Sequence, residues 1–125
     1  MMVSVVNDGT LLPFQAIYVG LSAASRPSKM AAYYDEVMNA EMLLEYLGTG
    51  MYWSNMAMMQ SFVDNILSAY FVCQRNILNL PPTQKALWQI DVWSVHRSKE
   101  FHEWMSQKHD DIIMDFIPGG CTGLA

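Results

Sequence analysis

The sequence predicts a single α/β domain in which helices flank a mixed β-sheet. Short runs rich in β-branched and aromatic residues alternate with stretches of helical period, in the order strand, strand, mixed helical region, long helix, strand, helix, strand. The chain has 125 residues, which is enough for one hydrophobic core. A hydrophobic fraction of 52% with 15% charged residues indicates a packed chain and excludes a disordered one. We therefore expect residues 1–125 to form one domain.

The N-terminal segment predicts an antiparallel hairpin. Residues 1–7 and 11–19 are both rich in strand-forming side chains. Asp8-Gly9 lies between them and tolerates the positive φ that a tight turn needs. Pro13 has no backbone N–H, so it favours a position at the edge of a sheet for the second strand.

Helical signals follow the hairpin. Residues 30–40 predict a short helix, whereas residues 42–47 fit either a continuation of that helix or a short strand. Ser54 or Asn55 can cap the N-terminus of a longer helix. That helix carries apolar side chains at helical spacing, which predicts a face turned to the core: Met59, Phe62, Val63, Ile66, Leu67 and Tyr70.

Residues 87–96 are the most informative stretch of the chain. Apolar and aromatic side chains nearly fill it, which is typical of a strand covered on both faces. Asp91 interrupts the run, and a charge in such a strand is costly unless it is paired, hydrogen-bonded or bound to a metal. Open α/β sheets bind ligands beyond the carboxyl ends of their strands, so Asp91 is the first candidate for chemistry. The alternative is an Asp that caps the following turn or bonds a backbone N–H.

The C-terminal part predicts a parallel β–α–β unit. Ser98 can cap a helix whose apolar face is formed by Phe101, Trp104 and Met105. Residues 112–118 predict the last strand, which should run parallel to the strand at residues 87–96 through a right-handed crossover. Residues 109–111 form a polar turn, whose carboxylates we expect to be solvated rather than to bind a metal.

Charge and cysteine content give no indication of several classes of protein. The net charge is -5, and the seven basic residues are scattered, approaching one another only at Arg97 and Lys99. A freestanding nucleic-acid binder usually has a basic surface, which this composition does not indicate. The two cysteines lack the spacing of a zinc site, and no apolar run is long enough for a membrane span. We expect no membrane partner.

Three stretches together carry a resemblance to a known family: NDGTLLPFQAIY at residues 7–18, LWQIDVWSVH at residues 87–96 and FIPGGCTGL at residues 116–124. With them, essentially the whole chain resembles the DDE superfamily endonuclease domain of pogo/Tigger-like transposases. The most specific piece is the strand that ends in Asp91, followed by Ser94 and His96. The resemblance implies a ribonuclease H-like fold and localisation in the nucleus.

The resemblance also implies a chemistry. In that family three acids bind two divalent ions, Mg²⁺ or Mn²⁺, which activate water or a DNA 3′-hydroxyl for attack on a phosphodiester. Asp91 matches the second acid, which makes it the implied catalytic metal ligand. His96 matches a histidine of the same motif, and its implied role is to orient Asp91 or to contact DNA. A structural His that caps the following helix is the open alternative. Arg97 and Lys99 are the implied DNA contacts.

The chain departs from the family pattern at the other two acids. The first acid would precede Met1 and the third would follow Ala125, and neither Asp8 nor Asp115 can replace them. We therefore expect an incomplete ribonuclease H-like domain that lacks the first central strand and the C-terminal helix. In such a domain the sheet is split, or the N-terminal hairpin pairs directly with the Asp91 strand.

Two functions are compatible with this pattern. The chain is either a fragment of a DDE transposase, whose parent family cuts and joins DNA, or a non-catalytic interaction module that pairs with a complete transposase copy. We expect the fragment to be inactive alone, with doubtful metal binding. The acidic net charge favours the interaction module, and the motif match favours the transposase ancestry.

Overall fold

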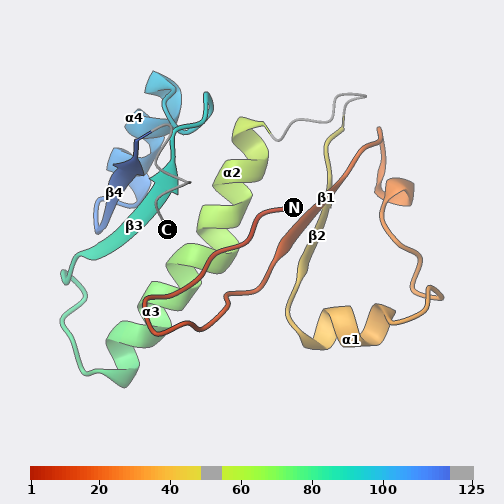
Figure 1. Cartoon of the computed structure of the whole chain (residues 1–125), viewed down its shortest axis with the longest axis horizontal. Coiled ribbons are helices and arrows are strands. Elements are labelled where there is room, and N and C mark those ends of the chain that lie inside the picture. Colours follow the sequence, from red (N-terminus) through yellow and green to blue (C-terminus); the bar gives the residue numbers. More distant parts are fainter. Residues whose placement is uncertain (49–54, 119–125) are drawn as a thin grey trace. The chain divides into compact units, whose positions relative to one another are not determined.

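The computed structural model describes residues 1–48 and 55–118 (Figure 1). The chain divides into two compact units, Met1–Leu67 and Ser68–Ala125. Each unit contains one two-stranded parallel sheet together with helices. The predicted mixed α/β class is therefore confirmed. Within the described residues, no helix is both long and apolar enough to span a membrane.

The sheet of the first unit pairs β1 (Gln15–Tyr18) with β2 (Leu43–Tyr46) in parallel (Figure 1). A 3₁₀ turn at Ala23–Ser25 and the short helix α1 (Tyr34–Asn39) lie between these strands in the sequence. The predicted short helix is thus present but covers only six residues. Of the ambiguous residues 42–47, Leu43–Tyr46 form the strand β2. The helix does not continue into them, because Glu41 has a positive φ of 55°, which is incompatible with an α-helix.

The predicted N-terminal hairpin is present as an antiparallel pairing. Gly9 has a φ of 88°, and the Oδ1 atom of Asp8 accepts a hydrogen bond of 2.8 Å from the Thr10 backbone N–H. Two isolated antiparallel bridges connect the segments before and after this turn. They pair Met2 with Gln15 and Val5 with Leu11. The two bridges do not extend into a continuous ladder of backbone hydrogen bonds, so residues 1–7 form no regular strand.

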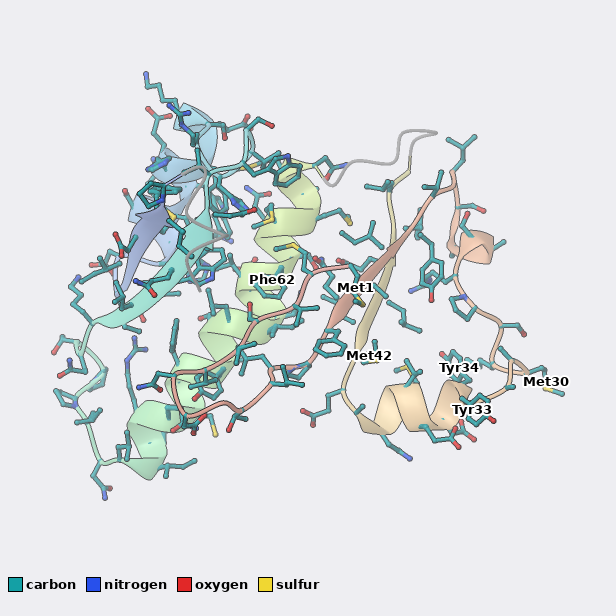
Figure 2. All side chains as sticks on the ribbon, in the orientation of Figure 1. Met1, Met30, Tyr33, Tyr34, Met42 and Phe62 are labelled. Carbon is teal, nitrogen blue, oxygen red and sulfur yellow. The ribbon has the colours of Figure 1, made fainter. Side chains whose placement is uncertain are left out.

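The long helical segment begins where the cap signal places it. The Oδ1 atom of Asn55 accepts a hydrogen bond of 3.1 Å from the Met58 N–H, and Ser54 lies outside the described residues. Helix α2 (Met56–Phe62) continues into a π-helical turn at Val63–Leu67. The predicted apolar face is buried, and Phe62, which Figure 2 labels on this helix, is completely inaccessible. Only Tyr70 of the predicted set is half-buried.

The second unit contains the predicted parallel β–α–β arrangement. Its sequence order is α3 (Ser68–Ile77), β3 (Ala86–Asp91), α4 (Lys99–Lys108) and β4 (Ile112–Ile117). Strands β3 and β4 pair in parallel along their whole length (Figure 1). Ser98 caps α4 as predicted, because its Oγ atom accepts a hydrogen bond of 3.2 Å from the Phe101 N–H.

The expectation that this strand is covered on both faces is wrong. Burial alternates along β3, with Trp88 and Ile90 buried while Leu87 is 59% exposed. The reason is that α4 packs on one face of the strand, where the rings of Trp88 and Phe101 lie 6.5 Å apart. The opposite face carries Leu87 and Asp91 toward solvent.

Each of the two units has its own sheet. Among the described residues, β1 hydrogen-bonds β2 in the first unit and β3 hydrogen-bonds β4 in the second. The expectations of a split sheet and of a hairpin paired with the Asp91 strand both stay predictions.

Candidate functional site

Asp91 is the last residue of β3 and lies at the carboxyl end of that strand, as predicted. The predicted strand at residues 87–96 was too long, because the chain leaves the strand after Asp91 and forms a turn at residues 94–97. Its side chain is 75% exposed because it belongs to the open face of the β3–β4 sheet. The carboxylate is therefore hydrated, and the predicted cost of placing a charge in a buried strand does not arise. Asp91 has no need of a metal or a buried partner to be tolerated there.

His96 is bonded to Asp91 at two points. The Nδ1 atom of His96 lies 3.0 Å from the backbone oxygen of Asp91 and 3.2 Å from its Oδ1 atom. Both oxygens can only accept hydrogen bonds, so Nδ1 carries the proton. The contact closes the turn after β3 and holds one carboxylate oxygen of Asp91 toward the imidazole.

Aromatic rings enclose the imidazole of His96. The ring centroids of Trp93, Trp88 and Phe101 lie 5.3, 6.3 and 6.3 Å from the centroid of His96. The histidine is only 5% exposed, and its buried Nε2 atom has no hydrogen-bond partner among the described residues. The buried imidazole of His96 therefore packs between β3 and α4 and holds the turn that connects them.

This geometry separates the roles considered for His96. A side chain that is 5% exposed is not available to contact DNA. Ser98, and not His96, caps the N-terminus of α4. The contacts between His96 and Asp91 fit the implied role of orienting Asp91, which stays a prediction.

The two basic candidates follow the turn. Arg97 is exposed, and Lys99 is exposed at the first position of α4. The Nζ atom of Lys99 lies 3.5 Å from a carboxylate oxygen of Glu103, one helical turn later. An exposed pair of this kind is weak, about 0.3–0.5 kcal/mol, so a phosphate can compete with Glu103 for the lysine.

A second carboxylate lies on the same face of the sheet as Asp91. Asp115 is opposite Gln89 in the parallel register and accepts a hydrogen bond of 3.1 Å from its Nε2 atom. The described residues nevertheless contain no group of three His, Cys, Asp or Glu side chains that could hold a metal ion. One acid at the end of β3 does not fit the two-metal centre that the resemblance implies, and we derive no metal-dependent step.

The turn at residues 109–111 is solvated only in part. The Asp110 side chain is 82% exposed, as expected. His109 is buried at the C-terminus of α4, however, and Asp111 forms an ion pair with the Nη2 atom of Arg75. The Nε atom of Arg75 donates a second hydrogen bond of 2.9 Å to the backbone oxygen of Gln84. Arg75 was not identified from the sequence, although a lone arginine in the apolar course of α3 is a usable signal.

A polar cluster in the first unit was also missed. Gln15 is completely buried, and its Nε2 atom donates hydrogen bonds to Glu45 Oε2 and, at 2.9 Å, to the backbone oxygen of Met58. The Oγ atom of Ser61 donates a hydrogen bond of 2.6 Å to the other carboxylate oxygen of Glu45. This cluster ties β1, β2 and α2 together.

Comparison of the chain with protein-family models, curated proteins and solved structures gives no match. The family resemblance of the three stretches therefore stays a hypothesis, which rests on the residues themselves and on the geometry at the end of β3.

Proposed function

We propose that the chain derives from the ribonuclease H-like endonuclease domain of pogo/Tigger-like DDE transposases. One observation carries the proposal. The D-x-x-S-x-H stretch places Asp91 at the carboxyl end of the first strand of a parallel β–α–β unit, with its carboxylate held by the buried His96. Ligands of open α/β sheets bind at that end of the strand. Nuclear localisation is part of the same proposal.

The proposed activity of this chain is contact with DNA, not catalysis. The parent family cuts and joins DNA with three acids and two divalent ions, whereas Asp91 is the one acid that this chain matches to the family pattern. Arg97 and Lys99 follow Asp91 in the same turn and can contact phosphate oxygens. A Mg²⁺ or Mn²⁺ ion at this end of β3 would have a single carboxylate ligand from the described residues, and its binding would be weak.

A second function has support from the exposed face of the β3–β4 sheet. Leu87 and Ile113 are direct partners in the register and are 59% and 50% exposed. An exposed apolar pair on a sheet is a site at which another protein can pack. The second candidate is therefore a non-catalytic module that binds a complete transposase copy through this face.

Paramagnetic broadening by Mn²⁺ tests whether the end of β3 retains the weak ion binding that the proposed ancestry implies. We expect Mn²⁺ to broaden the backbone amide signals of Asp91 and Val92 in the NMR spectrum of the isotope-labelled chain, because Asp91 is the proposed ligand. Asp91→Asn should abolish this broadening. Asp115→Asn removes an exposed carboxylate from the same face and should leave it intact, which makes it the matched control.

The outcome distinguishes the two candidates. Broadening that persists in Asp91→Asn, or that centres on other acids, contradicts the metal-site ancestry. The interaction module predicts instead that Leu87→Ser weakens binding to a complete transposase copy, while Asp91→Asn leaves that binding unchanged.

A further inference from the structure

The first unit contains a pocket that is unrelated to the Asp91 turn. Its volume is about 390 Å³, near the lower end of the range of small-molecule sites, about 300–1,000 Å³. The residues that line it come from the segment before α1, from α1 itself and from the start of β2. They include Arg26, Lys29, Tyr34, Met38, Met42 and Leu44, and Figure 2 labels Tyr34 and Met42.

The charge at this pocket is opposite to that of its surroundings. Residues 1–67 carry six acidic side chains and only two basic ones, Arg26 and Lys29. Both basic side chains line the pocket, and none of the six acids does. Among the described residues, neither Arg26 nor Lys29 forms an ion pair. The pocket is therefore lined by both basic side chains of residues 1–67 and by none of the acidic ones.

The exposed guanidinium of Arg26 makes two weak contacts, neither of which neutralises its charge. Its Nη1 atom donates a long hydrogen bond of 3.5 Å to the backbone oxygen of Leu44. Its Cζ atom lies 5.8 Å from the ring centroid of Tyr46, within the range of a cation–π contact. These contacts involve one of five N–H donors, and an arginine fork with unused donors matches a carboxylate.

The remaining wall of the pocket is apolar. Met42 and Leu44 are half-buried, and Met38 is 45% exposed on α1. Methionine side chains adapt to the shape of an apolar ligand because they are unbranched and polarizable. The lining of the pocket thus combines apolar side chains with two cationic ones.

We propose that this pocket binds a small amphipathic carboxylate. The carboxylate pairs with Arg26 and Lys29, and a short aliphatic body packs on Met38, Met42 and Leu44. The site uses no residue of the Asp91 turn, so the inference stands apart from the transposase ancestry.

Octanoate is the probe, with 1-octanol as a ligand that has the same apolar body and no charge. The full chain is titrated with each ligand while backbone amide signals are followed by NMR. We expect saturable shifts at Tyr34, Leu43 and Leu44 with a Kd of about 1 mM for octanoate, which is the affinity of an efficient ligand of this size. The shifts with 1-octanol at equal concentration should be several-fold smaller.

Charge-removing variants test the two cationic side chains. Arg26→Gln and Lys29→Gln should each weaken octanoate binding by about 5- to 10-fold, the effect of one charge-assisted contact, without changing the response to 1-octanol. Lys85→Gln, which removes an exposed lysine of the second unit, is the matched control and should change nothing. The amide spectrum of each variant reports whether the variant is folded. If Arg26→Gln disturbs β2, Lys29→Gln still tests the proposal, because Lys29 is exposed and its replacement should not affect folding.

Three results would overturn the proposal. The first is an equal response to octanoate and 1-octanol. The second is a set of octanoate shifts that do not saturate or that map outside the pocket. The third is octanoate binding that is unchanged in a folded Lys29→Gln variant.

Discussion

The ion pair between Arg75 and Asp111 should be a main determinant of the stability of the second unit. Replacing Asp111 with Asn leaves the guanidinium of Arg75, which is 90% buried, without a counter-ion. Removing one partner of a fully buried pair costs about 3–5 kcal/mol. The Asp111 side chain is 26% exposed, so water can partly solvate the orphaned charge. We therefore expect a loss of about 2–3 kcal/mol in the free energy of unfolding.

Asp110 supplies a matched control one residue away. Its carboxylate is 82% exposed and lies 3.9 Å from the Nζ atom of Lys85, which is also exposed. Surface pairs of this kind contribute about 0–1 kcal/mol, so Asp110→Asn should be nearly neutral. The two variants make the same chemical change and differ in the burial of the partner.

Urea unfolding followed by tryptophan fluorescence measures both variants, because Trp88, Trp93 and Trp104 all belong to the second unit. Asp111→Asn should lower the urea midpoint with little change in the slope m. The double replacement Arg75→Met with Asp111→Leu should restore most of the loss, since an apolar pair removes the buried charge. Equal midpoints for Asp110→Asn and Asp111→Asn would refute the reasoning.

Three further outcomes follow from single contacts. Ser98→Ala removes the cap of α4 and should cost about 1 kcal/mol in urea unfolding. Phe101→Ala empties a fully buried position and should cost about 3–5 kcal/mol, whereas Leu87→Ala, at an exposed position of β3, should cost well under half of that. The Thr10 backbone N–H, with a smaller contribution from the Thr10 side chain, lowers the pKa of Asp8. The stability that the hydrogen bond from the Thr10 N–H to Asp8 contributes is then fully present above the ordinary pKa of an aspartate. It is lost as the pH falls through the lowered pKa of Asp8. The Thr10 amide signal should titrate at that lowered pKa and stop titrating in Asp8→Asn.

Local signals in the sequence located most helices. Asn55 and Ser98 are both followed by apolar residues at helical spacing, and both cap the helices that they predicted. Capping is a contact between near neighbours in the chain, so it can be read from a short window. The π-helical turn at Val63–Leu67 has no such signal, because the apolar spacing there is also that of an α-helix.

Properties that depend on distant residues were not predictable. Apolar side chains nearly fill the run at residues 87–93, which predicted a strand covered on both faces, yet Leu87 is exposed because one helix covers only one face of the sheet. Arg75 and Asp111 are 36 residues apart, so their ion pair requires the tertiary structure. The same holds for Gln15 and Glu45, whose contact depends on the parallel pairing of β1 with β2.

The candidate site was predicted in position but not in detail. The placement of Asp91 at the end of a strand follows from the hydrophobic run and the turn after it. The burial of His96 depends on Trp88, Trp93 and Phe101, which converge from β3, the turn and α4. That convergence favours the orienting role of His96 over a direct contact with DNA.

Binding of a short DNA duplex, measured as a function of salt with amide NMR signals as the readout, tests the proposed ancestry most directly. We expect shifts confined to the segment from Asp91 to Lys99, with log K falling against log[salt] at a slope of about -2 for two phosphate contacts. Arg97→Gln should reduce that slope by about 1, and Lys108→Gln, a control at the far end of α4, should leave it unchanged. Shifts that map elsewhere, or a slope that Arg97→Gln does not alter, would contradict a DNA-contacting role for the end of β3.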